Sequence, residues 1–366
     1  MTETMKINIG PQHPSTHGVL RLVTELDGED IVSVTPVIGY LHRGLEKSAE
    51  SRTYLQYLPM VDRVDYLSGF FNSYAYITAV ENICNIDVPK RAEYIRVLCM
   101  EMNRMTSHLL WFGTYILDLG ATSPLFYSFR DREPLMSLFE ELTGQRMMYN
   151  YFTFGGVRFD VTKEWLDKIL KYTDEMPAKL DDYEKIITSN PIFLTRTKNK
   201  GILSKNTALK YSITGPCLRA SGVNLDFRKN FGYSIYGELD FEPPVETDGD
   251  TFARYKVRIA EMRMCLSVIR QCVDYLKNNS GEISAKVNSV ALKVPEGEYT
   301  TYVESPRGLL NCYVKSDGTN KPYRVKWRTG SFYLVQMLPE ILKGHSMHDI
   351  MAIFGSLDVI LPEVDR

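Results

Sequence analysis

The N-terminal segment Gly10–Gly18, with the sequence GPQHPSTHG, places two histidines four residues apart. Its prolines keep it out of a helix, so His13 and His17 cannot form the metal pair that an i,i+4 spacing gives on a helical face. Two histidines without a nearby cysteine or carboxylate are also a weak metal site. Such histidines are more often structural. The functional alternative is a rigid loop that aims a proton donor.

A second candidate is Asp118, which interrupts the apolar run Tyr115–Leu119. It falls in the last turn of a predicted helix, where the helix dipole disfavours a carboxylate. A desolvated carboxylate at this place needs a cationic or hydrogen-bonding partner, or else it takes up a proton. The alternative interpretation is an exposed aspartate that only ends the helix.

A third candidate is the segment Leu58–Leu67, which reads LPMVDRVDYL. Between apolar residues it holds four groups that can ionise or donate hydrogen bonds: Asp62, Arg63, Asp65 and Tyr66. On composition alone, a capped helix with an Asp–Arg ion pair is the simpler interpretation.

The six cysteines are scattered along the chain, at Cys84, Cys99, Cys217, Cys265, Cys272 and Cys312. No pair has the C-x-x-C spacing of zinc or iron–sulfur ligation, and buried thiols are common in protein cores. We therefore predict no metal and no cluster in this chain. An electron carrier would have to come from a partner.

The composition is that of a globular protein, with 366 residues, 44% of them apolar and 24% charged. A net charge of −2 does not favour nucleic-acid binding. No apolar run reaches the roughly 20 residues that a membrane helix needs, and Met1–Thr4 begins no apolar signal core. We expect a soluble protein of a reducing compartment.

The elements that would position these residues change character along the chain. Strand patterns cover Lys6–Gly10, Gly18–Leu26 and Ile31–Val37, whereas two prolines keep residues 11–17 out of regular structure. A long helix is predicted from Asp87 to Gly120 by an apolar stripe of helical period. Further helices are predicted around 131–146, 163–188, 249–277 and 332–343, and strands near 209–213, 289–293, 299–304 and 311–315.

No alternation of strand, helix and strand is present, which favours an α+β fold with a mainly helical core and small antiparallel sheets. We expect a single domain over residues 1–366. Its parts would be an N-terminal β-rich part at about 5–40, a helical core at about 61–280 and a C-terminal β/α part at about 289–366.

Long motifs along the whole chain resemble the hydrogenase-like, quinone-site subunit of the complex I-type NADH:quinone oxidoreductases, a relative of the nickel–iron hydrogenase large subunit. The motifs are GPQHPSTHGVLRL (10–22), IGYLHRGLEK (38–47), VDRVDYLSGF (61–70), LDLGATSPLFYSFRDRE (117–133), LRASGVNLDFRK (218–229), SDGTNKPYR (316–324) and GSLDVILPEVDR (355–366). The resemblance implies the hydrogenase large-subunit fold and a role in quinone reduction.

Carried over by position, His17 and Tyr66 resemble the pair that hydrogen-bonds the two ends of the quinone headgroup, and Asp118 resembles the carboxylate partnered with that histidine. His13 is the neighbour of the headgroup histidine. Reduction of a quinone takes two electrons and two protons. The resemblance thus implies a tyrosine and a histidine that donate protons to the carbonyl oxygens as charge builds there.

The resemblance also implies an electron donor outside this chain. Arg43 and Arg63 resemble arginines near the terminal [4Fe-4S] cluster of a partner subunit, where positive charge would favour the reduced cluster. Many relatives carry a histidine close to that cluster, but this chain has Met148 there. Two further departures are Leu309, where the family usually has Glu, and a shorter connection around 278–296.

The implied partners are the cluster-bearing small subunit, other hydrophilic-arm subunits and membrane-embedded subunits that translocate ions. The chain would be peripheral on the cytoplasmic side, or the stromal or matrix equivalent, of an energy-transducing membrane. The electron donor stays open between NADH, ferredoxin and reduced deazaflavin, and the quinone type is open too.

Hydrogenase activity is the main alternative on the same fold. It needs four cysteines in two C-x-x-C pairs, the first at the positions of Asp65 and Ser68 and the second near Ile360 and Glu363. None of these residues is cysteine, so nickel and iron would have no thiolate ligands. This excludes a hydrogenase.

A non-catalytic scaffold is the other alternative. The presence of His17, Tyr66 and Asp118 together argues against it.

Overall fold

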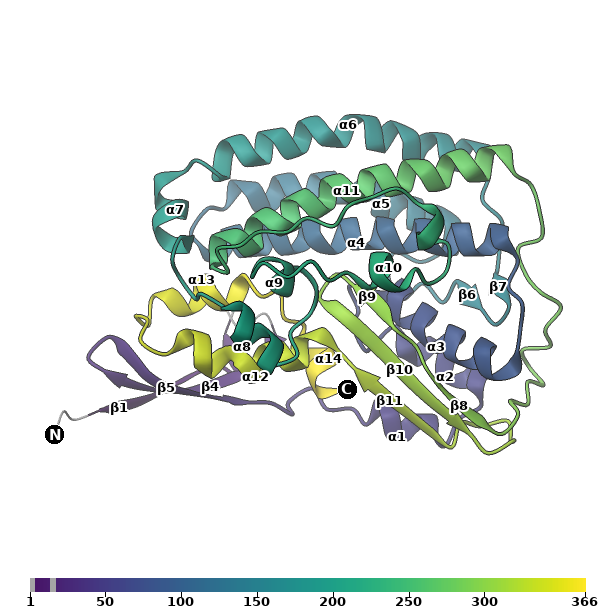
Figure 1. The fold of residues 1–366 in the computed structure, drawn as a ribbon, viewed down its shortest axis with the longest axis horizontal. Coiled ribbons are helices and arrows are strands. Elements are labelled where there is room, and N and C mark those ends of the chain that lie inside the picture. Colours follow the sequence, from purple (N-terminus) through teal and green to yellow (C-terminus); the bar gives the residue numbers. More distant parts are fainter. Residues whose placement is uncertain (1–3, 14–17) are drawn as a thin grey trace.

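The computed structural model describes residues 4–13 and 18–366 (Figure 1). His17 and the side chain of His13 lie outside the described residues. Within the described ranges, no helix is both long enough and apolar enough to cross a membrane.

The N-terminal part forms a three-stranded antiparallel sheet in the order β1-β4-β5. Its strands are β1 (Met5–Ile9), β4 (Arg21–Asp27) and β5 (Asp30–Val37). The predicted strand over 18–26 is divided at Leu20, because β3 (Gly18–Val19) pairs with β2 (Gln12–His13) and not with this sheet. Residues 12–13 were predicted to be irregular, and that was wrong: the prolines flank these two residues, so their own N–H groups remain available.

The middle of the chain is a layered array of long helices that lie side by side (Figure 1). They are α3 (Gly69–Cys84), α4 (Lys90–Asp118), α5 (Ser123–Thr143), α6 (Lys163–Ile187) and α11 (Thr251–Asn278). The shorter elements are α1 (Leu45–Ala49), α2 (Tyr54–Val61), β6 (Phe152–Thr153), β7 (Gly156–Val157), α7 (Pro191–Thr197), α8 (Lys205–Lys210), α9 (Gly215–Arg219), α10 (Phe227–Phe231) and η2 (Tyr236–Glu238).

Helix α4 is buried along most of its length, including its polar residues. A network of charged side chains and one histidine, all without solvent exposure, holds α4 to α11 and to the α9–α10 region. The network comprises Glu101, Arg104, His108, Arg219, Asp226, Arg228, Glu261 and Glu304. Buried charges are tolerated when they are paired in this way.

The C-terminal part combines an antiparallel sheet, in the order β11-β10-β8 with β9 paired to β10, and three helices. These elements are β8 (Gly297–Thr300), β9 (Val303–Ser305), β10 (Gly308–Ser316), β11 (Arg324–Arg328), α12 (Gly330–Leu342), α13 (Asp349–Gly355) and α14 (Leu361–Asp365). One apolar core joins the long helices to this sheet, and a second joins α12–α14 to the N-terminal sheet. The predicted α+β class is confirmed.

Several element boundaries differ from the prediction. Helix α4 begins at Lys90 and not at Asp87, because Pro89 has the extended ψ of 138°. Helix α5 begins at Ser123 and not near 131, since a proline is tolerated in the first turn. The strand predicted at 209–213 is wrong: Ser204 caps a short helix there. The strand predicted at 289–293 is absent from this described stretch.

Candidate functional site

The C-terminal segment 355–366 contacts several of the predicted site residues or their chain neighbours. A Cβ placed on Gly18, the residue after His17, would lie 3.1 Å from Leu361 Cδ1. A Cβ placed on Gly355 would lie 3.6 Å from a carboxylate oxygen of Asp118 at the end of α4. Elements far apart in the sequence therefore meet along this segment.

Tyr66 lies in the turn between α2 and α3 and is 36% exposed. Burial and the nearby carboxylates of Asp65 and Asp358 raise the pKa of its phenol above the ordinary value, while Arg307 acts in the opposite direction. The phenol therefore remains protonated at neutral pH and can donate a hydrogen bond. It has the partial exposure that a group contacting a substrate needs.

Behind Tyr66, the side chain of Arg307 is completely buried. Its Nη1 donates to Asp65 Oδ2 at 2.8 Å and to Ser68 Oγ at 2.9 Å. Its Nη2 donates to Ser107 Oγ at 3.0 Å and lies 3.5 Å from Asp358 Oδ1. Asp65 and Ser68 stand where a hydrogenase would carry its first pair of cysteines. Here they bind the guanidinium group of Arg307.

The sequence reasoning missed Arg307 as a site residue. The sequence feature that could have indicated Arg307 is its place in the motif Ser305–Gly308, which forms a tight turn between β9 and β10. Gly308 has φ of 105°, and a Cβ there would lie 2.5 Å from Thr214 Oγ1, so glycine is needed. A turn fixed in this way holds the arginine in one place.

Arg43 and Arg63 are neighbours on an exposed face. Arg43 Nη2 donates to the carbonyl oxygen of Arg63 at 2.8 Å and to that of Pro362 at 3.3 Å. Burial lowers the pKa of Arg43, and Arg63 lowers it further, whereas Asp365 raises it. The structure thus brings together Arg43 and Arg63, for which the family resemblance implies the same position near a cluster of a partner subunit.

The loop that carries Met148 is attached next to Arg63. The Asn150 N–H donates to Asp62 Oδ2 at 3.2 Å, and Asp62 directly precedes Arg63 in the chain. Met148 is half-buried and has a φ of 58°. Tyr149, which follows it, stacks on Phe70 with ring centroids 4.0 Å apart. Arg43, Arg63 and the Met148 loop therefore occupy one region.

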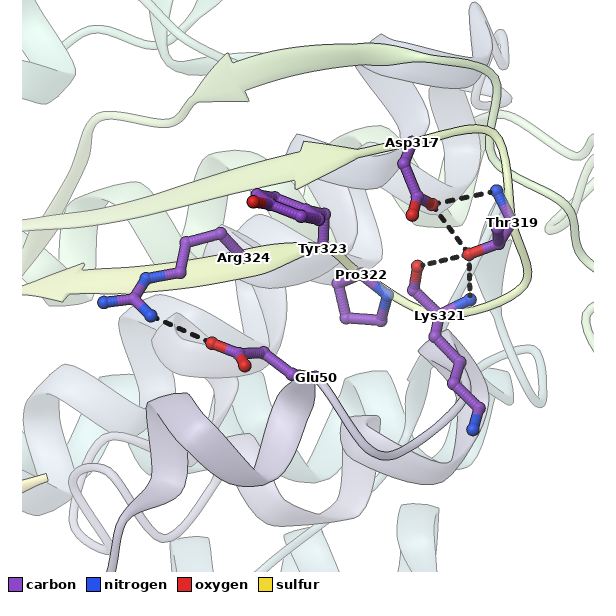
Figure 2. A pocket seen from close by; sticks show the side chains of 7 residues that line it. All are labelled: Glu50, Asp317, Thr319, Lys321, Pro322, Tyr323 and Arg324. Carbon is purple, nitrogen blue, oxygen red and sulfur yellow. Dashed lines mark hydrogen bonds and ion pairs between the residues drawn. The ribbon is translucent and has the colours of Figure 1, made fainter.

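A well-formed recess lies elsewhere, at the turn between β10 and β11 (Figure 2). Its volume is about 430 Å³. Arg324 Nη1 donates to Glu50 at 2.9 Å on one side, and the Thr319 hydroxyl donates to Asp317 at 2.8 Å on the other. None of the predicted site residues lines this recess, and its polar lining does not suit the apolar ring of a quinone.

We predict that the pure isolated chain contains no bound metal. In the described residues, no group of three or more His, Cys, Asp or Glu side chains is arranged to hold an ion, and nickel, iron or a cluster would need thiolates. Elemental analysis of the purified chain is the measurement. Stoichiometric nickel or iron would contradict the prediction.

The family model described as "Respiratory-chain NADH dehydrogenase, 49 Kd subunit" matches residues 118–293 and 283–366. The chain belongs to this family. The 49 kDa subunit family also accounts for the N-terminal part, because the alignments with curated relatives cover 100% of this chain and 99% of each relative.

Those relatives are proteins named as the D subunit of NADH-quinone oxidoreductase. The ones from Geobacillus kaustophilus and Geobacillus thermodenitrificans are each 48% identical to this chain, and the one from Bacillus mycoides is 47% identical. The resemblance drawn from the sequence motifs is therefore confirmed at the level of the 49 kDa subunit family.

Proposed function

We propose that this chain, together with a cluster-bearing partner subunit, forms the site where a complex I-type oxidoreductase reduces quinone. The observation that carries the proposal is the position of Tyr66. Its phenol is protonated and partly exposed, next to a buried arginine–carboxylate cluster. The names of its relatives, which are D subunits of NADH-quinone oxidoreductase, support the same reaction.

In this proposal, Tyr66 donates a hydrogen bond to one carbonyl oxygen of the quinone and His17 donates to the other. Hydrogen-bond donors aimed at the oxygens stabilise the charge that builds there as electrons arrive. Asp118 is the partner of His17 and favours its protonated form. Quinone is the substrate, and two protons and two electrons convert it to quinol.

The electrons would come from a terminal [4Fe-4S] cluster in the partner subunit, on the face that carries Arg43 and Arg63. Both arginines are exposed there, so their charge is available to a docked partner. Positive charge near a cluster stabilises its reduced form. Met148 would lie on the same face.

The relatives' name favours NADH as the electron source, with ferredoxin or reduced deazaflavin as alternatives. The further partners would be hydrophilic-arm subunits and ion-translocating membrane subunits, which place the chain on the cytoplasmic side, or its stromal or matrix equivalent. Mass spectrometry of the purified complex, which identifies its subunits and lipid quinones, tests this assembly.

We expect His17 and Asp118 to act as a unit. If Asp118 sets the protonation of His17, the losses in quinone reductase rate from His17→Ala and Asp118→Asn should be strongly non-additive, because the second change has little left to remove. A double-mutant cycle on the assembled complex measures this. Purely additive losses would show that the two side chains are not coupled.

A further inference from the structure

Three buried carboxylates interact electrostatically with the guanidinium group of Arg307. Asp65, Asp358 and Glu363 are at most 4% exposed. The first two form ion pairs with Arg307, at 2.8 and 3.5 Å. Burial lowers the pKa of Arg307, but these three carboxylates and Tyr66 raise it above its ordinary value. All four groups therefore lie within electrostatic reach of one cation.

Glu363 differs from the other two carboxylates. Among the described residues it forms no ion pair within 4 Å, and its partners are neutral: the backbone N–H of Ser331, at 2.8 Å from Oε1, and the Ser331 hydroxyl. Burial and the charge of Asp65 raise the pKa of Glu363 to about 7, although Arg307 and Ser331 lower it. A buried carboxylate without a paired cation holds a proton more tightly.

Burial raises the pKa of Asp358 as well, but the elements around this carboxyl group differ from those around Glu363. Asp358 faces Arg307 from the β9–β10 turn, Arg258 from α11 and His108 from α4, and each of them lowers the pKa of its carboxyl group. Asp65, from the α2–α3 turn, raises the pKa of both carboxyl groups. On Asp358 the arginines Arg307 and Arg258 outweigh it, whereas on Glu363 it outweighs Arg307. Arg328, at the end of β11, also interacts electrostatically with Glu363. Its guanidinium group, however, donates hydrogen bonds to the carbonyl oxygens of Leu309 and Ser212 and forms no ion pair with Glu363.

We propose that Glu363 is the internal proton donor that restores the neutral phenol of Tyr66 after quinone reduction, through the cluster of Asp65 and Arg307. This inference rests on the proposed function and extends it. Glu363 does not contact the substrate in this scheme, so it is a positioning and relay residue.

Each proton in the relay has a defined origin and destination. The O–H bond of Tyr66 breaks as its proton passes to the reduced quinone oxygen, which leaves a phenolate beside Asp65. The carboxylic acid of Glu363 gives its proton to the Asp65 carboxylate, and Asp65 passes it on to that phenolate. The Arg307 guanidinium stays protonated throughout and only stabilises the negative charge. The Glu363 carboxylate is then reprotonated by a proton taken up from the aqueous phase. Both electrons come from the donor of the complex, and none is exchanged in the relay.

The test is the pH profile of quinone reductase kcat in the assembled complex. A proton donor is active only below its pKa, so kcat of the unmodified complex should fall as pH rises through about 7. Glu363→Gln keeps an oxygen for Ser331 but cannot ionise. It should lower kcat by up to about 10²-fold, the lower end of what a positioned proton donor contributes, and abolish that inflection. Glu363→Asp should retain an inflection.

Glu340→Gln is the matched control, because Glu340 is exposed on α12. It should change neither kcat nor the profile. Ser331→Ala is a second, milder variant. It removes a hydroxyl that lowers the pKa of Glu363, so the inflection should move to higher pH. If the complex with Glu363→Gln does not assemble, the shift of the inflection in Ser331→Ala decides whether Glu363 is the proton donor.

An unchanged inflection in Glu363→Gln, or no upward shift in Ser331→Ala, would overturn the relay. Electron transfer to an artificial acceptor that bypasses quinone should be normal in every variant, and a loss there would also count against it. If Tyr66→Phe impairs quinone turnover while Glu363→Gln does not, only the relay fails. If Tyr66→Phe has full turnover, the proposed site itself fails.

Discussion

Replacement of Tyr66 by phenylalanine is expected to slow reduction of the physiological quinone severely while the complex still assembles and its clusters are still reduced. The change removes one hydroxyl group from a site whose phenol is protonated at neutral pH. Loss of an aligned donor typically costs about 1–4 kcal/mol of transition-state stabilisation, or roughly 5- to 10³-fold in rate. Steady-state quinone reductase kinetics measure the loss.

The loss should be mainly in kcat, because the hydrogen bond strengthens as charge builds on the quinone oxygen. Tyr299→Phe is the matched control: Tyr299 is 40% exposed on β8, and its replacement should leave turnover unchanged. Unchanged quinone turnover in an assembled Tyr66→Phe complex would refute the assignment of Tyr66.

Helices α4, α6 and α11 could be predicted from the sequence because each has many turns of regular apolar spacing, whereas α3 was not predicted as a separate helix and α5 begins earlier than predicted. The boundaries of α6 and α11 were predicted to within two residues at each end. Short elements were not, since four or five residues fit more than one pattern. The apolar residues at 209–213 suggested a strand, but a helical cap at Ser204 and the turn after Lys210 determine the backbone there.

The exposed part of the candidate site could be predicted from motifs, whereas the buried part could not. Asp65 and Arg307 are 242 positions apart, and no local pattern relates them. The polar residues of α4 are a similar case: Glu101 and Arg104 are buried because Arg228 and Glu261 pair with them. A sequence shows charges, but only the fold shows which of them neutralise each other.

The terminal cluster proposed for the partner subunit should have a midpoint potential that hardly changes between pH 7 and 8. A histidine beside a cluster binds a proton more tightly when the cluster is reduced, which lowers the potential by up to ~59 mV per pH unit for one electron and one proton. Met148 does not titrate. Burial raises the pKa of the adjacent Tyr149, so that phenol remains protonated over this range. Without that histidine we also expect the potential itself to be lower, which would suit a low-potential acceptor such as menaquinone.

Asp62, which follows α2 and accepts a hydrogen bond from the Met148 loop, is the titrating group to consider here. Burial raises its pKa to about 6, although Ser73, Asn150 and Arg63 lower it. A slope due to Asp62 should therefore begin near pH 6 and extend upward only as far as reduction of the cluster raises that pKa. EPR redox titrations of the assembled complex from pH 6 to 8 measure the slope.

Met148→His should introduce a slope toward the full proton-coupled value, since it places a group of pKa near 6.5 at this position. Met148→Gln is polar but does not titrate, so it should leave the potential independent of pH. A full slope at pH 7–8 in the unmodified complex would contradict the placement of Met148. If Asp62→Asn then removed that slope, the buried carboxylate would have replaced the histidine. If the slope persisted, the coupled proton would belong to a group other than Asp62.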